Sequence, residues 1–281
     1  MKSEELKKRL KELEYKKVLI YLVLIFFAIF YLMPLYTGIN VSLKPQSELA
    51  QTAVTPVKNP TIQTYMDAFE RIKGPLWNNI SFTVPAVLIS TFLGAMSGYI
   101  FSKFRFKYDT IIFFVVVMGF YVPPQSIIIP LMKTLTYFGI FDTIWGLIFI
   151  HVSLGMPITT MLWRDYYTSI PDEIVESAII DGNGIASVFK KIIIPLSVPG
   201  FIVVGLFQFV NIWNEYFIAI SVTATEAQPL SKAVVNLAGS TVAQWNVQSA
   251  GAMMMLLPCV LIFALIQRRL VRGLMAGAVK R

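Results

Sequence analysis

Apolar stretches of about 20 residues recur along this chain of 281 residues and limit the folds open to it. A helix of that length crosses about 30 Å of hydrocarbon, whereas a barrel strand needs only about 10 residues of alternating polarity. The composition agrees, because 56% of the residues are hydrophobic and only 14% are charged. We therefore predict an all-α, multi-pass protein of the cell (inner or plasma) membrane and exclude a porin-like barrel.

Hydropathy predicts six transmembrane helices, at residues 18–39, 79–102, 110–132, 143–163, 193–220 and 249–271. An even number of spans puts both ends of the chain on one side. Six of the 24 Lys and Arg residues fall on the opposite side, and the other 18 lie with the termini; the six are Lys44, Lys58, Arg71, Lys73, Lys133 and Lys232. Because positive residues collect on the cytoplasmic side, both termini are predicted to be cytoplasmic.

These spans divide the chain into four regions. Residues 1–17 form a cytoplasmic segment, and 18–78 comprise the first helix and a Pro-rich external loop with a short helix expected at 61–71. Residues 79–271 form a five-helix core that contains a cytoplasmic loop at 164–192. Residues 272–281 are predicted to be a cytoplasmic tail.

The residue inventory excludes several kinds of chemistry. The chain has one Cys, Cys259, and one His, His151, which are too few for a metal-ligand cluster or an internal disulfide. The dipeptide Gly-Lys never occurs, so the chain lacks a phosphate-binding GxxxxGK[ST] loop and cannot itself hydrolyse ATP by that route. One His, one Cys and a single acid inside a span are too few for a membrane-embedded hydrolase or transferase, so we predict no enzyme and no cofactor bound by this chain. The net charge of +8 is spread over four cytoplasmic segments, as membrane topology requires, and we expect no nucleic-acid partner.

The cytoplasmic loop has the pattern of two short helices joined by a tight turn. Ser169 is expected to be the N-cap of the first helix, with Pro171 in its first turn. An apolar stripe then ends at the turn; its members are Ile174, Val175, Ala178 and Ile179. Gly182 or Gly184 is expected to take a positive φ there. Taken alone, this pattern also fits a helix pair that lies on the membrane surface.

Three pieces of this loop resemble the EAA motif of the permease subunits of binding-protein-dependent ABC importers. They are Glu176-Ser177-Ala178, Asp181-Gly182 and Ile193-Ile194-Pro195-Leu196. Ser177 replaces the usual second-position Ala, and Ile194 replaces the Leu before Pro195. The likeness extends along the chain to the carbohydrate-uptake permeases, within them to the maltose-permease G-like subunits, and most closely to glucose/mannose-type permeases.

The resemblance implies a mechanism and a set of partners. It implies a heterodimer with a second permease subunit, two cytoplasmic ATPase subunits that bind ATP and Mg²⁺, an extracellular sugar-binding protein, and surrounding membrane lipid. It also implies ATPase-coupling positions, at Glu176, Ser177, Ala178, Asp181 and Gly182. Ala178 is expected to lie where the ATPase surface comes close. By the same resemblance the tail reaches the ATPases through Gly273, Ala276, Gly277 and Lys280; a frayed end is the less favoured alternative.

Polar residues inside the predicted spans are candidates for a substrate pathway. Tyr121 and Gln125 flank Pro123 and Pro124, where the third span is expected to kink or break. A bend that serves packing alone is an equal alternative. Asn211 and Glu215 could bind sugar hydroxyls beside Trp213, or could form an interface with the second permease, which we favour. His151 is predicted to be a packing residue.

These inferences predict a permease subunit of an ATP-driven importer for a sugar such as glucose or mannose. A permease of the same type for a disaccharide, an oligosaccharide or a glycerol-phosphate-like substrate is the alternative. A secondary transporter that works without ATP is a weaker one, because the spans show neither paired charges nor inverted repeats.

Overall fold

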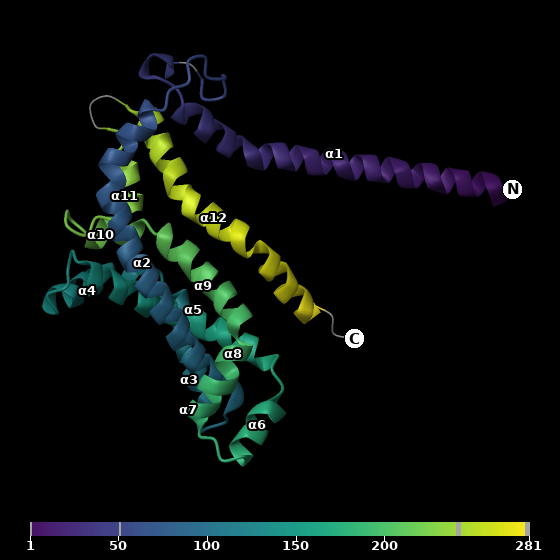
Figure 1. Ribbon diagram of the computed structural model, residues 1–281, viewed down its shortest axis with the longest axis vertical. Helices are drawn as coiled ribbons and strands as arrows, with labels where there is room; N and C mark the ends of the chain where they lie inside the picture. The colour runs from purple at the N-terminus through teal and green to yellow at the C-terminus, as the bar shows by residue number, and fades with distance from the viewer. Residues whose placement is uncertain (1, 51, 240–242, 279–281) are drawn as a thin grey trace. The chain divides into compact units, whose positions relative to one another are not determined.

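The computed structural model describes residues 2–50, 52–239 and 243–278, and in these ranges all regular secondary structure is helical. Side chains are described for 15–50, 52–239 and 243–267. The helices, in chain order, are α1 Lys2–Ser42, η1 Gln46–Glu48, α2 Gln63–Lys103, α3 Asp109–Met118, η2 Gly119–Tyr121, α4 Pro124–Tyr137, α5 Ile144–Thr168, α6 Asp172–Ile180, α7 Ile185–Val188, the π-helical η3 Phe189–Ile193, α8 Ile194–Leu196, α9 Val198–Trp213, α10 Phe217–Val222, α11 Leu230–Asn236 and α12 Trp245–Ala278 (Figure 1).

The predicted all-helical membrane fold is confirmed. Among the described residues, 4 helices are long and apolar enough to cross a membrane by themselves: Tyr15–Ser42, Gln63–Lys103, Ile144–Thr168 and Trp245–Gln267. Two bent pairs raise the number to 6 if each pair counts as one span. These pairs lie where the third and fifth spans were predicted.

Both bent pairs break at proline-containing segments. The axes of Asp109–Tyr121 and Pro124–Tyr137 differ by 96°, which confirms the break expected at Pro123 and Pro124. The axes of Ile185–Leu196 and Val198–Trp213 differ by 80°, with Pro199 in the first turn of α9. Proline has no N–H to donate to the preceding turn, so a helix readily changes direction there.

The continuous fifth span predicted at 193–220 is wrong. A bend at Ser197 precedes α9, and three non-helical residues, 214–216, separate α9 from α10. The short external helix predicted at 61–71 is also wrong, because Gln63 begins a helix of 41 residues that continues through the second span. Hydropathy reports where apolar residues lie, but it does not report whether neighbouring helical turns stay in line.

The chain divides into two compact units, of which the first comprises residues 1–70 and 237–254. Two buried polar side chains order its loop. The Glu48 carboxylate accepts the backbone N–H groups of Lys58 and Asn59, each at 3.0 Å, and these bonds lower the pKa of Glu48. The Asn40 amide donates to the carbonyls of Ala53 and Thr55, each at 2.7 Å. The predicted loop between the first two spans is therefore a folded segment.

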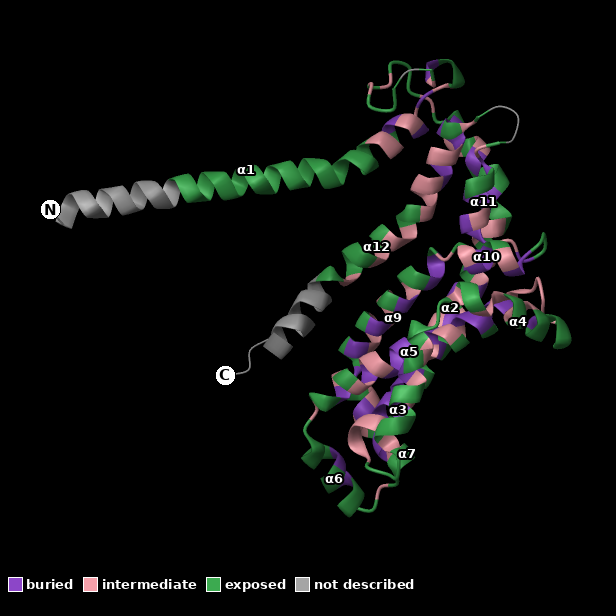
Figure 2. Cartoon of the chain, turned by 180° about the vertical axis from the view of Figure 1, so that it is seen from behind, coloured by how far each residue is buried: buried purple, intermediate pink, exposed green. Residues whose placement is uncertain are grey.

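The second unit comprises residues 71–236 and 255–281, and within it α2 and α5 are in close contact. Gly94 and Gly98 of α2 face α5 closely enough that no side chain would fit. A Cβ on Gly98 would lie 2.6 Å from the Trp163 Cβ and 2.7 Å from the Arg164 backbone nitrogen. Small residues four apart allow this approach of two helices in a membrane protein. Figure 2 shows how strongly α5 is buried.

Two clusters of buried residues fill the second unit. The first surrounds α5 near its start and holds Phe82, Leu135, Leu147, Ile150 and Ile218. The second contains four aromatic residues, which we call the aromatic cluster: Tyr99, Trp163, Tyr167 and Phe189. Their ring centroids lie close together, at 5.1 Å for Trp163 and Tyr167 and 5.2 Å for Tyr99 and Phe189. The aromatic cluster joins α2, α5 and η3 at the end of the unit that carries α6 (Figure 1).

A carboxylate anchors the loop between α10 and α11. Asp142 lies between α4 and α5 with a positive φ of 53°, and its oxygens accept four backbone N–H groups, those of residues 224–227. Burial opposes the charge, but the four donors outweigh it and lower the pKa of Asp142.

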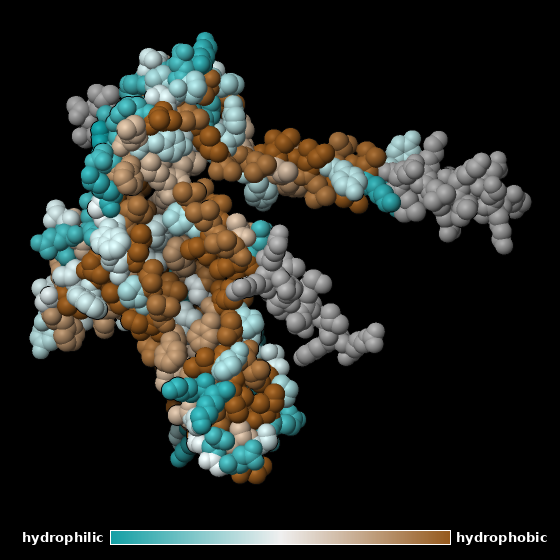
Figure 3. Space-filling model, in the orientation of Figure 1, coloured by the Kyte–Doolittle hydropathy of each residue, from teal (hydrophilic) through white to brown (hydrophobic). Residues whose placement is uncertain are grey.

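The surface of the second unit matches a membrane environment. Figure 3 shows apolar residues continuous over the long helices, and a mixture of hydrophilic and apolar residues at the end that carries α6. Many large apolar side chains of α2 and α3 are exposed, among them Leu88, Ile111, Phe114 and Val115. In water such a surface would be a liability, so lipid or other membrane helices are its natural surroundings.

The contact between α2 and α5 yields a first prediction. Gly98→Ala should lower stability by about 1–3 kcal/mol, because the new methyl group meets a backbone nitrogen that cannot move aside alone. Gly205→Ala on α9 is the matched control, since its Cβ would meet no atom within 4 Å. The midpoint of thermal unfolding in detergent measures both; an equal midpoint for Gly98→Ala and wild type would contradict the tight contact.

Candidate functional site

The loop between α5 and α8 carries the motif found in the sequence, and its first helix begins later than predicted. Ser169 caps the C-terminus of α5, and its Oγ donates to the carbonyl of Tyr166 at 2.6 Å. Pro171 takes the N-cap position of α6, and Asp172 begins the helix. The prediction of Ser169 as N-cap is therefore wrong. Asp172 and Glu173 still lie in the first turn, where the helix dipole favours negative charge.

A glycine in the left-handed region ends α6. Gly182 has a φ of +86°, as predicted for one of the two glycines. Its N–H donates to the carbonyl of Ile179, and the N–H of Asn183 donates to the carbonyl of Ala178. These two bonds form a Schellman motif, which satisfies the last carbonyls of a helix and fixes the direction in which the chain leaves.

The two faces of α6 differ sharply. Val175 and Ala178 are buried and pack against the aromatic cluster. The other residues of α6 are exposed. Four of them lie on the opposite face, Glu173, Glu176, Ser177 and Ile180, whereas Ile179, one turn after Val175, lies at the edge of the buried side. Ile180 stands out, because 84% of its surface is exposed although the side chain is fully apolar. Only part of the predicted apolar stripe is thus buried.

The expected exposure of Ala178 to a partner is wrong. Only 6% of this residue is exposed, and its methyl group lies in the core cluster of the same chain. Its small size permits close packing of α6 on α2, α5 and η3. Spacing along the helix placed Ala178 and Glu176 in one motif, but two residues that are two positions apart on a helix point to different sides.

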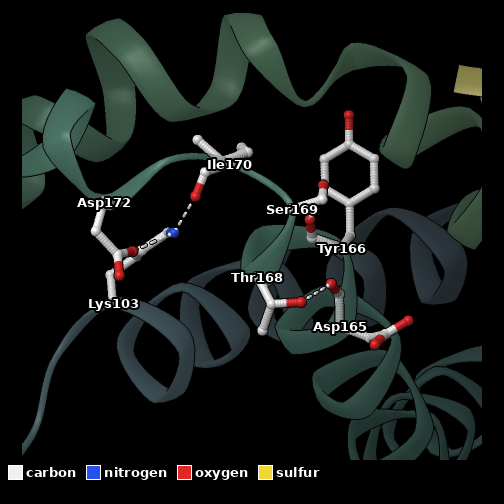
Figure 4. Close-up of polar contacts among 7 residues, drawn as sticks. All are labelled: Lys103, Asp165, Tyr166, Thr168, Ser169, Ile170 and Asp172. Atoms are coloured by element: carbon white, nitrogen blue, oxygen red, sulfur yellow. Dashed lines mark hydrogen bonds and ion pairs between the residues drawn. The ribbon is translucent and has the colours of Figure 1, made fainter. Parts of the chain in front are cut away.

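A buried cation holds the beginning of α6 (Figure 4). Lys103, the last residue of α2, directs its Nζ toward the segment before α6 and donates to the Ile170 carbonyl at 2.5 Å and the Asp172 carboxylate at 2.6 Å. Only 2% of the Lys103 side chain is exposed, compared with 69% for Asp172. Sequence reasoning treated Lys103 only as one of the charges that set topology, so this contact was missed.

A cavity of about 280 Å³ lies among α4, α5, α9 and α10 in the second unit. Four polar side chains line it, together with apolar residues such as Phe120 and Ile158; the four are His151, Gln208, Asn211 and Glu215. Gln208 is buried and donates to the Ser90 Oγ of α2 at 3.1 Å. Gly155 leaves the room for its amide, because a Cβ there would lie 2.2 Å from the Gln208 Nε2.

Glu215 lies at the break between α9 and α10 and faces two ways. Its carboxylate accepts the N–H groups of Ile218 and Ala219, at 2.8 and 3.0 Å, so it caps the first turn of α10. The same side chain forms part of the cavity wall. The sequence suggested a sugar contact or a subunit interface, and the capping role is a third that only the helix break creates.

The other predicted pathway residues are dispersed. Trp213 is buried, stacks on Phe209, and donates from its indole nitrogen to the Met255 carbonyl at 2.9 Å. Trp213 therefore does not line the cavity, and a sugar contact, the less favoured alternative for this group of residues, would not include its ring. Tyr121 and Gln125 are exposed and do not line the cavity, so their role in a pathway stays a prediction.

Two further predictions concern His151 and the tail. His151 stacks on Phe82 with ring centroids 5.4 Å apart, as expected for a packing residue, and it also lines the cavity. The helix α12 continues through Gly273, Ala276 and Gly277 to Ala278. Lys280 lies outside the described residues.

Comparison with known proteins gives consistent matches. Residues 90–275 match the family described as "Binding-protein-dependent transport system inner membrane component". The chain is 40% identical to a "Probable ABC transporter permease protein" of Pyrococcus horikoshii, over 94% of this chain and 97% of the relative. It is 28% identical to the glucose import system permease protein of Saccharolobus solfataricus, over 93% and 94%.

A solved structure has the same fold. The crystal structure of a bacterial ABC transporter involved in the import of the acidic polysaccharide alginate aligns with a TM-score of 0.74. The alignment covers 89% of this chain and 95% of the other at 20% identity. At that identity the likeness concerns the fold alone.

The turn after α6 yields a second prediction. Gly182→Val should loosen the end of α6 at a cost of about 1–3 kcal/mol, because a β-branched residue is strained at positive φ. Gly184→Val is the matched control, since Gly184 has an extended backbone with a φ of −71°. Hydrogen exchange of the α6 amides should be about tenfold faster or more in Gly182→Val only. Equal exchange in the two variants would contradict a strained turn.

Proposed function

This chain belongs to the carbohydrate-uptake family of binding-protein-dependent ABC importer permeases, and from that premise we propose that it forms one half of a heterodimeric pore for a monosaccharide such as glucose or mannose. The second half is another permease subunit, and an extracellular binding protein delivers the sugar. Two cytoplasmic ATPase subunits bind ATP and Mg²⁺ and supply the energy. The positive-inside distribution of Lys and Arg supports cytoplasmic termini, with α6 on the same side.

The exposed face of α6 is the observation that carries the coupling part of this proposal. A helix of nine residues is fixed to the core by Val175 and Ala178 and turns Glu176, Ile179 and Ile180 outward. Apolar side chains on a polar, solvent-facing helix are favourable when a partner surface covers them. We assign that surface to an ATPase groove, with Glu176 and Ser177 at its polar rim. Asp181 and Gly182 set the angle of the helix, and the end of α12 contributes a second ATPase contact.

The cavity beside α9 supports the proposal of a small sugar. Its volume of about 280 Å³ lies just below the range of about 300–1,000 Å³ typical of sites for drug-sized ligands, so a single ring fits better than an oligosaccharide. Amide and carboxylate groups from Gln208, Asn211 and Glu215 offer hydrogen bonds to hydroxyl groups. No Lys or Arg occurs among the described residues that line it, which argues against a glycerol-phosphate-like substrate.

The docking surface yields a third prediction. Ile180→Asp should reduce co-purification of the ATPase about tenfold, because it removes an apolar contact worth about 1.5–3 kcal/mol and adds a charge that must be desolvated. Ile62→Asp is the matched control, since Ile62 is 71% exposed in the segment before α2. Normal membrane levels of both variants show that insertion is intact. Equal ATPase retention by the two would contradict docking through α6.

The substrate class is tested with the complete transporter in proteoliposomes. Binding protein loaded with a single sugar should stimulate ATP hydrolysis most with glucose or mannose, and less with a disaccharide or with glycerol phosphate. Asn211→Leu should then weaken sugar uptake by about tenfold, since one polar group of the cavity is lost while ATPase assembly is unchanged. Stimulation by a disaccharide alone would replace the monosaccharide proposal. Uptake without ATP would replace the importer by a secondary transporter.

A further inference from the structure

Lys103 occupies an unusual place for a lysine. Its side chain is 2% exposed at the cytoplasmic end of α2, and its Nζ bridges the Ile170 carbonyl and the Asp172 carboxylate just before and within the first turn of α6. We propose that Lys103 is a positioning residue that fixes the coupling helix to α2, so that a displacement of α6 by the ATPase is passed directly to α2. This inference rests on the proposed docking role of α6.

The energetics of the contact point to positioning rather than to general stability. Asp172 is 69% exposed, so water can solvate its charge whether or not Lys103 is present. The ammonium group of Lys103, by contrast, has left most of its water and depends on its two acceptors. An exposed lysine would be sufficient if only a positive charge were needed on this side of the membrane. Lys107, Lys190 and Lys191 are exposed lysines of that kind. The burial of Lys103 is explained by the geometry that it imposes on the start of α6.

Because Lys103 lies on α2, its contact with α6 is connected to other parts of the second unit through that helix. One turn earlier on the same helix, Tyr99 packs against Tyr167 and Phe189 of the aromatic cluster. Three turns and more before Lys103, Ser90 accepts a hydrogen bond from Gln208, which lines the cavity. Since α2 is one continuous helix of 41 residues, it links the base of α6 to the cavity wall. The chain itself connects α6 to α5 on one side and leads to η3 on the other. The contact of Lys103 with Asp172 connects α6 to α2 as well, although these two residues are 69 positions apart in the sequence.

The alternative is that Lys103 only sets topology or binds lipid phosphate. Both roles need an ammonium group that is open to water or to headgroups. The Nζ of Lys103 instead points inward to Ile170 and Asp172 (Figure 4). A membrane role would also be shared by Lys107, four residues further on and exposed. The comparison of these two lysines therefore separates the interpretations.

The experiment uses the complete transporter, with both permeases and both ATPases, in proteoliposomes. Lys103→Met removes the charge and keeps an unbranched apolar stem, and Lys107→Met is its control. For each variant, ATPase co-purification, ATP hydrolysis and sugar uptake are measured. Lys103→Met should retain the ATPase within about twofold of wild type, yet transport about fivefold less sugar per ATP hydrolysed or worse. Lys107→Met should match wild type in all three.

A second pair of variants keeps the test decisive if Lys103→Met is absent from the membrane. Asp172→Lys places a cation beside Lys103, whereas Asp165→Lys makes the same charge change at another exposed position, near the end of α5 and outside the docking face of α6. Only Asp172→Lys should lower the ratio of sugar to ATP. The double variant Asp172→Asn, Lys103→Met should have the same ratio of sugar to ATP as Lys103→Met alone, because both substitutions remove the same contact between residues 103 and 172.

The outcomes distinguish this inference from the proposed function. An unchanged ratio of sugar to ATP in Lys103→Met or in Asp172→Lys, with the ATPase still bound, would overturn the positioning role and leave docking intact. Equal ATPase retention by Ile180→Asp and wild type would instead overturn docking through α6. Equal loss of coupling in Lys103→Met and Lys107→Met would assign the effect to cytoplasmic charge, and would also overturn the inference.

Discussion

The close contact between α2 and α5 is the interaction on which the rest of the second unit depends. Gly94 and Gly98 let the two backbones approach to a distance that a single added methyl group would prevent. In a membrane the hydrophobic effect contributes little to helix association, so such packing has to supply much of the stability. The pair then carries both candidate sites: α2 ends at Lys103, which contacts the start of α6, and α5 contributes His151 and Gly155 to the cavity wall.

Breaks in the helices create the cavity, and local hydrogen bonds make those breaks tolerable. Unsatisfied backbone groups are costly at membrane depth, so each break needs acceptors and donors nearby. Glu215 supplies two acceptors for α10, and Ser197 donates from its Oγ to the carbonyl of Ile193 at the bend before α9. Polar residues that resemble ligand-binding groups in the sequence therefore also serve the backbone. Capping and lining a cavity are compatible roles for Glu215, because each carboxylate oxygen has more than one lone pair.

Charged residues near α6 likewise have more than one role. Lys103 and Arg164 both belong to the positive residues that indicate topology, and both are engaged in packing: Lys103 holds the start of α6, and the Arg164 guanidinium lies 4.1 Å from the centre of the Phe113 ring. The aromatic cluster packs against Val175 and Ala178. One face of α6 is thus packed on the core, and the other is exposed. Under the proposed docking role, this division would let a helix of nine residues pass a displacement by the ATPase to the core of the second unit.

Sequence by itself determined the properties that depend on composition and on local pattern. Long apolar runs determined a helical membrane protein, the paired prolines determined a break near Pro123, and Gly182 was required for the turn after α6. The motif in the loop determined the family. The tertiary structure alone decided which side of α6 is buried, that Trp213 packs inside, and that Lys103 reaches Asp172 across 69 residues of sequence. The physical reason is that periodicity defines faces of a single helix, whereas burial and long-range polar contacts depend on which other helices those faces meet.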